Sequence, residues 1–268
     1  MHPVLFKYGF IEVRFYGLMY VVAILAATYI IKREVVRKAI GLGADDVVNF
    51  ITWTVIAGVV GARIYYVVFT LDYYMANPAE IPAIWHGGLA IHGGLIGGAV
   101  AAWVYLRRHG VPFWRMADAV APALILGQTF GRLGNFMNGD AHGRPTTMPW
   151  GIVFPPGSIA GSQFPGIPLH PTMLYEMAIN FSIFLFLWLS LRKGDHKDGF
   201  IFAAYFALYS SGRFVVEGFR ADSLMLGPIR VAQLVSAAVD ISVAVLIINR
   251  RLWEPQAMEA KKTKRKRS

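Results

Sequence analysis

The sequence contains no cysteine among its 268 residues. This absence excludes disulfides, cysteine-ligated metals and a cysteine nucleophile, so a thiol that takes part in the chemistry must belong to a substrate. Charge is also scarce, because Asp, Glu, Lys and Arg make up 16% of the chain, against 56% hydrophobic and 14% aromatic residues. A soluble domain needs more polar surface than this composition provides. The chain is therefore expected to be a membrane protein.

Long apolar runs fill most of the sequence. Seven of them approach the ~20 residues that cross a hydrocarbon core. They cover residues 16–31, 47–71, 89–106, 117–137, 172–191, 199–219 and 230–249. The first run lacks a basic start and a small-residue cleavage site, so we expect a retained span and no cleaved signal peptide. The sequence predicts an all-α polytopic bundle of about seven transmembrane helices, forming a single integral membrane domain over residues 1–268.

Acidic residues are fewer than basic ones, with 16 Asp and Glu against 26 Lys and Arg. Most of the basic residues fall in the segments 32–38, 107–115, 192–197 and 250–267, which lie on one side of such a bundle. The positive-inside rule then predicts an outer N-terminus and a cytoplasmic C-terminus. The basic tail Lys261–Arg267 could bind nucleic acid, but it closely follows a membrane helix. Contact with anionic membrane lipid is the better interpretation, and no nucleic acid partner is expected.

Polar side chains are concentrated in residues 127–146, GQTFGRLGNFMNGDAHGRPT, where an apolar run ends. A charge at membrane depth costs roughly 2.5–3.5 kcal/mol on insertion scales, so Arg132 is expected to have a partner. A negatively charged ligand is the natural candidate. Residues 139–171, which follow, are rich in Gly and Pro and too polar to cross a bilayer. They are predicted to form a small extracytoplasmic cap between the fourth and fifth spans.

A polar stripe marks the end of the sixth run. At 100° per residue, Tyr209, Arg213, Glu217 and Arg220 share one helical face. Glu217 is expected to pair with both arginines and to fix their guanidinium groups. Such a network can hold helices together, or it can present arginines to a ligand, and the pattern alone allows both.

Five further residues stand at positions that a structural role or a ligand could explain. Tyr16 opens the first span, where aromatic residues commonly form an interface belt. His92 has glycines on both sides, in GGLAIHGGL, which would let a ligand approach its imidazole. Arg63 is expected to pair with a carboxylate and hold the bundle together. Thr172 and Glu176 could cap the fifth span.

Five motifs in order are similar to those of the bacterial prolipoprotein diacylglyceryl transferases. They are FYG at 15–17, HGGL at 92–95, GRLGNFMN at 131–138, HPTMLYE at 170–176 and YSSGRFVVE at 209–217. Each motif alone would be a weak signal, while five in sequence are highly specific. The family transfers diacylglycerol from phosphatidylglycerol to a lipoprotein precursor. One departure is Asp140, which stands where the family usually has Glu.

The resemblance implies substrates, a location and a site. The substrates would be phosphatidylglycerol and precursors with a lipobox cysteine, handled in the bacterial cytoplasmic (inner) membrane by a site towards the outer leaflet. No cofactor and no metal are implied. The implied catalytic residues are Tyr16, His92, Arg132 and Arg213, and the implied substrate-binding residues are Asn135, Asn138, Asp140, Gly143, Tyr209, Glu217 and Arg220.

The expected reaction is attack of the precursor's thiolate on the glyceryl carbon that bears the phosphate. His92 would take the thiol proton, because histidine accepts protons near neutral pH and the thiolate is the nucleophile. Arg132 and Arg213 would stabilise the glycerol phosphate that leaves. Planar guanidinium groups suit this purpose because they bind phosphate oxygens in pairs.

Three other classes of function are considered. A transporter for an anionic solute could use the same arginines, but the two halves of the chain show no repeat. An intramembrane serine protease would need a pair such as Ser211 and His92. A metal site could be assembled from His86, His92, His142 and His170, although their spacings match no common ligand pattern.

Overall fold

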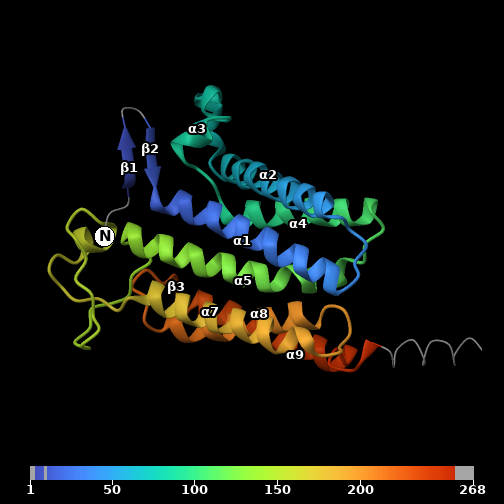
Figure 1. The fold of residues 1–268 in the computed structure, drawn as a ribbon. Helices are drawn as coiled ribbons and strands as arrows, with labels where there is room; N and C mark the ends of the chain where they lie inside the picture. The colour runs from blue at the N-terminus through green and yellow to red at the C-terminus, as the bar shows by residue number, and fades with distance from the viewer. Residues whose placement is uncertain (1–3, 9–10, 257–268) are drawn as a thin grey trace, which may run out of the picture. The chain divides into compact units, whose positions relative to one another are not determined.

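The chain is mostly helical in a computed structural model, which describes residues 4–8 and 11–256. The helices are α1 (Phe15–Arg37), α2 (Ala44–Phe69), α3 (Leu71–Ala76), α4 (Ile91–Arg108), α5 (Phe113–Asn138), α6 (Ile159–Gln163), α7 (Thr172–Leu189), α8 (Phe200–Glu217) and α9 (Val231–Arg250) (Figure 1). Short 3-10 turns lie at η1 (Pro78–Glu80), η2 (Ile84–His86) and η3 (Leu191–Lys193). A long helix therefore covers each predicted apolar run.

Among the described residues, 4 helices are long and apolar enough to cross a membrane. They are α1, α2, α9 and the segment Thr172–Lys193, which joins α7 to η3. Many of their apolar side chains are exposed, including Leu25 and Trp53, as expected for helices that face lipid. The all-α membrane bundle is thus present in its main features. Helices α5 and α8 carry the arginines that the sequence singles out, and these charges lower their hydropathy.

Two small β-hairpins were not expected from the sequence. Strands β1 (Val4–Tyr8) and β2 (Ile11–Arg14) pair antiparallel just before α1. Strands β3 (Met225–Leu226) and β4 (Ile229–Arg230) pair antiparallel between α8 and α9. Gly227, with φ 59°, makes the second turn in the left-handed region that favours glycine. Each strand is too short to give a periodic signal.

The chain forms two compact units. The smaller unit is Lys32–Met116, and the larger unit contains residues 1–31 and 117–268. In the smaller unit, α2 and α4 pack through glycines. A Cβ on Gly93 would lie 2.2 Å from the Gly61 carbonyl oxygen, and one on Gly97 would lie 2.4 Å from that of Ala57. The two backbones are therefore in direct contact, as small residues permit between membrane helices.

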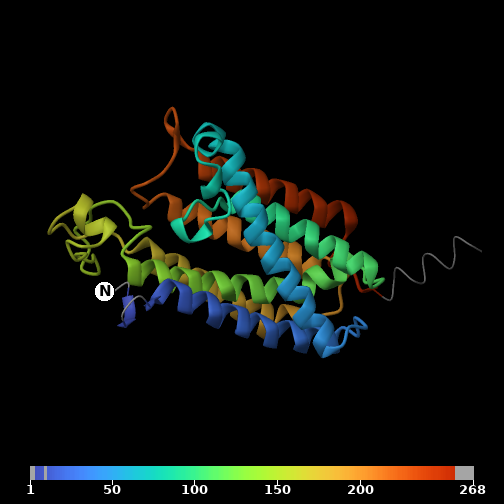
Figure 2. The same cartoon turned by 90° about the horizontal axis from the view of Figure 1, so that it is seen from above.

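The larger unit has its apolar core between α5, α7 and α8. The core residues are Ala121, Ile125, Ile183, Leu187, Ile201 and Tyr205. The Asp118 carboxylate of α5 accepts hydrogen bonds from the backbone N–H groups of Gly199 and Phe202, at 3.0 Å and 2.9 Å, and so fixes the start of α8. Residues 139–171 continue beyond the end of α5 (Figure 2). They contain α6 and contribute to a second apolar cluster of Phe154, Ala160, Leu169 and Met173.

Candidate active site

A buried glutamate gathers three arginines in the larger unit. Glu176 lies in the first turns of α7 and is 3% exposed. Its Oε2 is 2.5 Å from Nη2 of Arg132 on α5, and its Oε1 is 2.7 Å from Nη1 of Arg213 on α8. Arg220, which follows α8, places Nη1 3.2 Å from the same Oε1. One carboxylate on α7 thus joins the end of α5 to the end of α8, which are far apart in the sequence.

Glu217 supports the same arginines from the last turn of α8. Its Oε2 lies 2.6 Å from Nη2 of Arg213 and 4.0 Å from Nε of Arg220, so the predicted pairing is confirmed. The prediction of one helical face is wrong for Arg220, because α8 ends at Glu217. Arg220 instead donates from Nε and Nη2 to the two carboxylate oxygens of Asp222, at 3.0 Å and 2.8 Å. Arg230 adds a hydrogen bond to the Glu217 carbonyl.

The acidic and the basic side chains of the cluster differ in solvent exposure. The side chains of Glu176 and Glu217 are 4% and 1% exposed, whereas those of Arg132 and Arg213 are 22% and 21% exposed. The acids are therefore sealed inside, and each of these two arginines keeps part of its guanidinium accessible. Buried charges of one sign would be costly, so the two acids make the arginine cluster possible. The accessible edges can bind an anion such as a phosphate.

Asparagines connect the cluster to the cap segment (residues 139–171). Arg132 donates from Nη1 to Asn135 Oδ1 at 3.3 Å, and Asn135 donates from Nδ2 to Asp140 Oδ1 at 2.6 Å. Asn138 donates to the other Asp140 oxygen at 3.4 Å. The chain reverses at Gly139, where φ is +66°, so Asp140 folds back onto the last turn of α5. The shorter acid at position 140 still reaches both amides.

Two tyrosines flank the arginines. Tyr16, near the start of α1, packs on Gly134, where an added Cβ would lie 2.6 Å from Tyr16 Cδ2. Its hydroxyl is 3.3 Å from that of Tyr20. Tyr16 therefore contacts the turn of α5 that carries Arg132. Tyr209 lies one turn before Arg213 on α8 and stacks on Tyr205 with ring centroids 6.1 Å apart.

Gly143 is a junction between chain segments. Its N–H donates to the His170 carbonyl at 2.9 Å, and the next residue, Arg144, donates its N–H to the Phe219 carbonyl at 2.9 Å. A Cβ on Gly143 would lie 2.6 Å from His170 Cβ and 2.7 Å from the Phe219 oxygen. Only glycine fits here, and this close contact holds the cap segment against the residues that carry Arg220.

His92 belongs to the smaller unit. It is exposed, in the first turn of α4, with its ring centroid 5.9 Å from that of Tyr65. Gly93, which follows it, contacts Gly61 of α2, so helix packing requires a glycine at this position. The glycine flank of His92 is thus explained at this position by helix packing, without a ligand.

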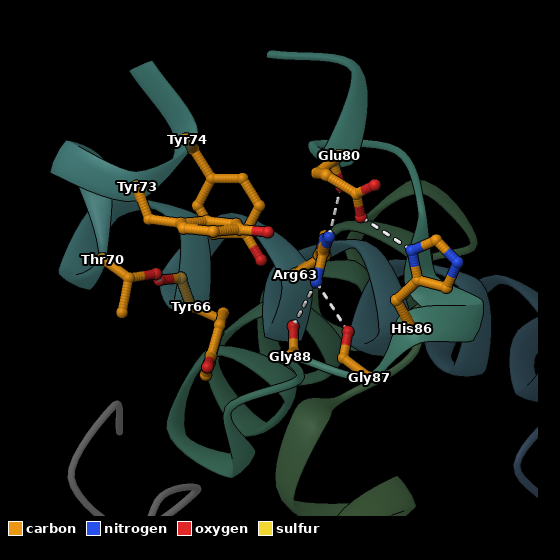
Figure 3. A pocket seen from close by; sticks show the side chains of 9 residues that line it. All are labelled: Arg63, Tyr66, Thr70, Tyr73, Tyr74, Glu80, His86, Gly87 and Gly88. Atoms are coloured by element: carbon orange, nitrogen blue, oxygen red, sulfur yellow. Dashed lines mark hydrogen bonds and ion pairs between the residues drawn. The ribbon is translucent and has the colours of Figure 1, made fainter. Parts of the chain in front are cut away.

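Among the described residues, no carboxylate pairs with the Arg63 guanidinium, contrary to expectation (Figure 3). Its hydrogen-bond acceptors among the described residues are backbone carbonyls of the loop after α2, reached from Nε, Nη1 and Nη2, and its guanidinium also lies over the Tyr74 ring, 5.0 Å from the ring centroid. These carbonyls are those of Ile81 at 2.8 Å, Gly87 at 2.6 Å, Gly88 at 2.9 Å, Glu80 at 2.5 Å and Ala83 at 3.5 Å. An arginine has five N–H groups, so Arg63 has no donor left for an anion. Its role is structural, as predicted, but with different partners.

A cavity of about 290 Å³ opens beside Arg63, lined by three tyrosines and by the pair Glu80 and His86. His86 Nδ1 lies 2.7 Å from Glu80 Oε2 (Figure 3). The other histidines considered for a metal have separate surroundings: His142 is buried near Phe164, and His170 contacts the Tyr175 hydroxyl at 3.1 Å. Within residues 4–8 and 11–256, no group of three or more His, Cys, Asp or Glu side chains could hold a metal.

The predicted capping role of Thr172 and Glu176 is also wrong. The N-cap of α7 is Pro171, which makes no side-chain cap, and the Thr172 hydroxyl donates to the Ala141 carbonyl at 2.8 Å. Glu176 lies within a predicted apolar run, as Arg132 does, and an acid in such a run needs a partner of opposite charge. Applied to Glu176, this argument would have predicted an ion pair with an arginine.

Comparison with known proteins gives consistent results. The family model of prolipoprotein diacylglyceryl transferase matches residues 3–249. Phosphatidylglycerol–prolipoprotein diacylglyceryl transferase of Trichormus variabilis is 44% identical over 247 residues, covering 87% of this chain and 84% of the relative. The protein of the same name from Clostridioides difficile is 42% identical, covering 88% and 90%. That from Bacillus cereus is 41% identical, covering 92% and 91%.

Proposed function

The chain belongs to the prolipoprotein diacylglyceryl transferase family, and we propose that it transfers the diacylglyceryl group of phosphatidylglycerol to the lipobox cysteine of lipoprotein precursors. The product is a thioether, and the reaction is the first step of lipoprotein maturation. The observation that carries the site assignment is the shared carboxylate of Glu176, which holds Arg132 and Arg213 together. Two adjacent, partly open guanidinium groups suit a phosphodiester.

The phosphate binds the accessible edges of Arg132 and Arg213 while Glu176 keeps the opposite edges fixed. The precursor's thiolate attacks the glyceryl carbon that bears the phosphate, so a C–S bond forms as the C–O bond breaks. The electron pair of the C–O bond goes to the phosphate oxygen, and glycerol phosphate leaves with the added negative charge. Prepositioned cations stabilise that charge more in the transition state than in the bound lipid, which lowers the barrier.

The remaining candidate residues have supporting roles. His92 is the proposed acceptor of the thiol proton, because a neutral imidazole has one ring nitrogen that can accept a proton. Tyr16 lies against the α5 turn of Arg132 and provides a hydroxyl for the headgroup. The residues Asn135, Asn138, Asp140 and Gly143 shape the headgroup pocket, and Tyr209, Glu217 and Arg220 orient Arg213.

The proposal also includes a membrane arrangement. Seven spans, counting α4, α5 and α8, form a single integral membrane domain with the N-terminus outside and the C-terminus in the cytoplasm. The cap segment is extracytoplasmic, and the site opens towards the outer leaflet of the bacterial inner membrane. The basic tail Lys261–Arg267, for which we predict lipid contact, lies outside the described residues.

The test is transfer in a defined system. Purified protein is incubated with phosphatidylglycerol and a lipobox peptide, and a second reaction contains the peptide with its cysteine replaced by serine. We expect a mass gain equal to diacylglyceryl only with cysteine, and little or none with Arg132→Ala or His92→Gln protein. Absence of the mass gain with wild-type protein would refute the activity, and wild-type rates from either variant would remove that residue from the mechanism.

A further inference from the structure

A second polar layer lies one helical turn beyond the arginine cluster. On α5, Gln128 precedes Arg132 by four residues, and on α7, Asn180 follows Glu176 by four residues. Four residues of helix correspond to a rise of about 6 Å. Helix α5 runs towards the cap segment and α7 runs away from it (Figure 1), so both amides are displaced from the cluster in the same direction. That direction leads away from the cap segment, along the helices.

These amides carry buried polar atoms with no partner among the described residues. Asn180 is 2% exposed, and its Nδ2 makes no hydrogen bond to any of them. The Oε1 atom of Gln128 is also buried without a partner there, while its Nε2 donates to the Tyr205 hydroxyl at 2.8 Å. A buried polar group left unsatisfied costs about 1–3 kcal/mol. Such groups are rare in native proteins, and two at one depth call for a specific explanation.

We propose that Asn180 and Gln128 bind the two acyl ester carbonyls of the donor lipid. This proposal rests on the proposed function, because it requires a diacylglyceryl phosphate on Arg132 and Arg213. The ester carbonyls of such a lipid lie a few bonds beyond the carbon that bears the phosphate, a reach comparable with one helical turn. Carbonyl oxygens accept hydrogen bonds, and Asn180 Nδ2 is an unused donor. The side chains that now cover Asn180 move aside when the glycerol backbone enters.

Gln128 supplies the second donor by turning its amide. The Tyr205 hydroxyl can accept a hydrogen bond from Nε2, as observed, or donate one to Oε1. Rotation of the amide by half a turn therefore keeps the contact with Tyr205 and frees the NH₂ group for a lipid carbonyl. Two amides then match two ester groups, and the subsite selects for diacyl ester lipids over lipids that lack carbonyls.

The experiment compares two lipids in one preparation. Wild-type, Asn180→Leu and Gln128→Met proteins are reconstituted and assayed for transfer from phosphatidylglycerol and from its diether analogue, which keeps the phosphate and loses both carbonyls. We expect wild type to prefer the diester, and each variant to lose about three- to tenfold in kcat/KM with the diester alone, the factor for one neutral hydrogen bond. Because the measure is a ratio between lipids, the amount of misfolded protein cancels.

Thr129→Val is the matched control. Thr129 is the neighbour of Gln128, and its hydroxyl donates within its own helix, to the Ile125 carbonyl at 3.0 Å. Its ratio between the two lipids should equal that of wild type. The proposal is overturned if wild type does not distinguish the lipids, or if the two amide variants lose the same factor with both. Transfer from phosphatidylglycerol would remain intact in those cases, whereas a failed proposed function would show no transfer by wild type from either lipid.

Discussion

Each compact unit contains arginines on or next to its long helices, and the partners of these arginines differ between the two units. Arg63 in the smaller unit donates to five neutral carbonyls of one nearby loop. Arg132 and Arg213 in the larger unit bind carboxylates on other helices and keep about a fifth of their side chains exposed. Carbonyl partners use every N–H group and fix a loop, while buried carboxylates balance charge and leave an edge open for a ligand. The partners therefore separate a structural arginine from the two that we propose bind the phosphate.

The largest expected effect is on Arg213. Arg213→Ala removes the guanidinium that bridges Glu176 and Glu217 and leaves two buried acids without that partner. We expect kcat/KM for transfer to fall by about 10²–10³-fold, as when a prepositioned electrostatic contact is lost. Arg213→Lys is the matched variant, since it keeps the charge and loses the planar fork. Recovery of most of the activity by lysine would show that charge, and not bidentate geometry, is what the site requires.

Glu176→Gln should give a smaller and more informative effect. The amide keeps the size of the side chain and removes the anion that three arginines share. The phosphate then has less competition for the guanidinium groups, so KM for phosphatidylglycerol should fall. At the same time Arg132 and Arg213 lose their fixed orientation, so kcat should fall by about tenfold, the loss expected for roughly one charged hydrogen bond.

Steady-state kinetics with a lipobox peptide separates these two effects. A purely structural Glu176 would lower the amount of active enzyme and leave KM unchanged, and that result would contradict the positioning role. Glu176→Asp serves as the control, because it keeps the charge on a shorter side chain. Its KM should stay near the wild-type value.

Arg63→Met tests whether the arginine of the smaller unit has a structural role only. The methionine leaves five loop carbonyls without their donor, so the unfolding free energy should fall by about 3 kcal/mol, within the range for loss of a buried network. The activity per folded molecule should stay within about twofold, because Arg63 has no donor for a ligand. Thermal unfolding in detergent measures the stability. Titration of the active sites gives the number of folded molecules by which the activity is divided.

Gly88→Ala probes the same contact from the loop. A Cβ at this position would lie 2.4 Å from Arg63 Nη1, and the φ of +74° is unfavourable for alanine. Gly88→Ala should therefore lower the unfolding free energy, as Arg63→Met does. A large loss of transfer per folded molecule in either variant would mean that the two kinds of arginine site are not distinct in function.

The positions of the helices and of the arginine cluster could be predicted from the sequence. The acidic side chains that pair with the arginines could be predicted only in part. Apolar runs and basic loops locate helices because lipid demands long apolar segments. The pairing of Glu217 with Arg213 followed from i,i+4 spacing on one helix. Glu176 could not be placed by spacing, since its partners lie on α5, α8 and the following loop, and only the fold brings them together.

Carbonyl partners are harder still to predict. Every residue has a backbone carbonyl, so no side-chain pattern marks the loop that binds Arg63. The same holds for Gly143, whose small size matters because two other segments press against it. The glycines after His92 illustrate the converse: a pattern that suggested room for a ligand is explained at Gly93 by contact with α2. Close backbone approach and ligand access give the same glycine signal in a sequence.

The smallest predicted effect concerns pH and the cap segment. Burial is the main cause that lowers the pKa of His142, with Arg220 acting in the same direction and Asp222 and Asp140 opposing it. The unfolded chain, with a histidine pKa of about 6.5, therefore binds more protons than the folded chain just below that pH. Stability should therefore fall as the pH is lowered through this window, and the loss should level off below the folded-state pKa, where both states are protonated.

The measurement is the thermal unfolding midpoint of wild type and His142→Leu across that pH range. Leucine fits the apolar surroundings near Phe154 and Phe164 and cannot be protonated, so the variant should show a flatter pH profile. His170, whose pKa is also lowered mainly by burial, should contribute in the same direction, so some slope should remain. Equal slopes in the two proteins would show that His142 titrates alike in both states, and the cap segment would then gain no stability from keeping it neutral.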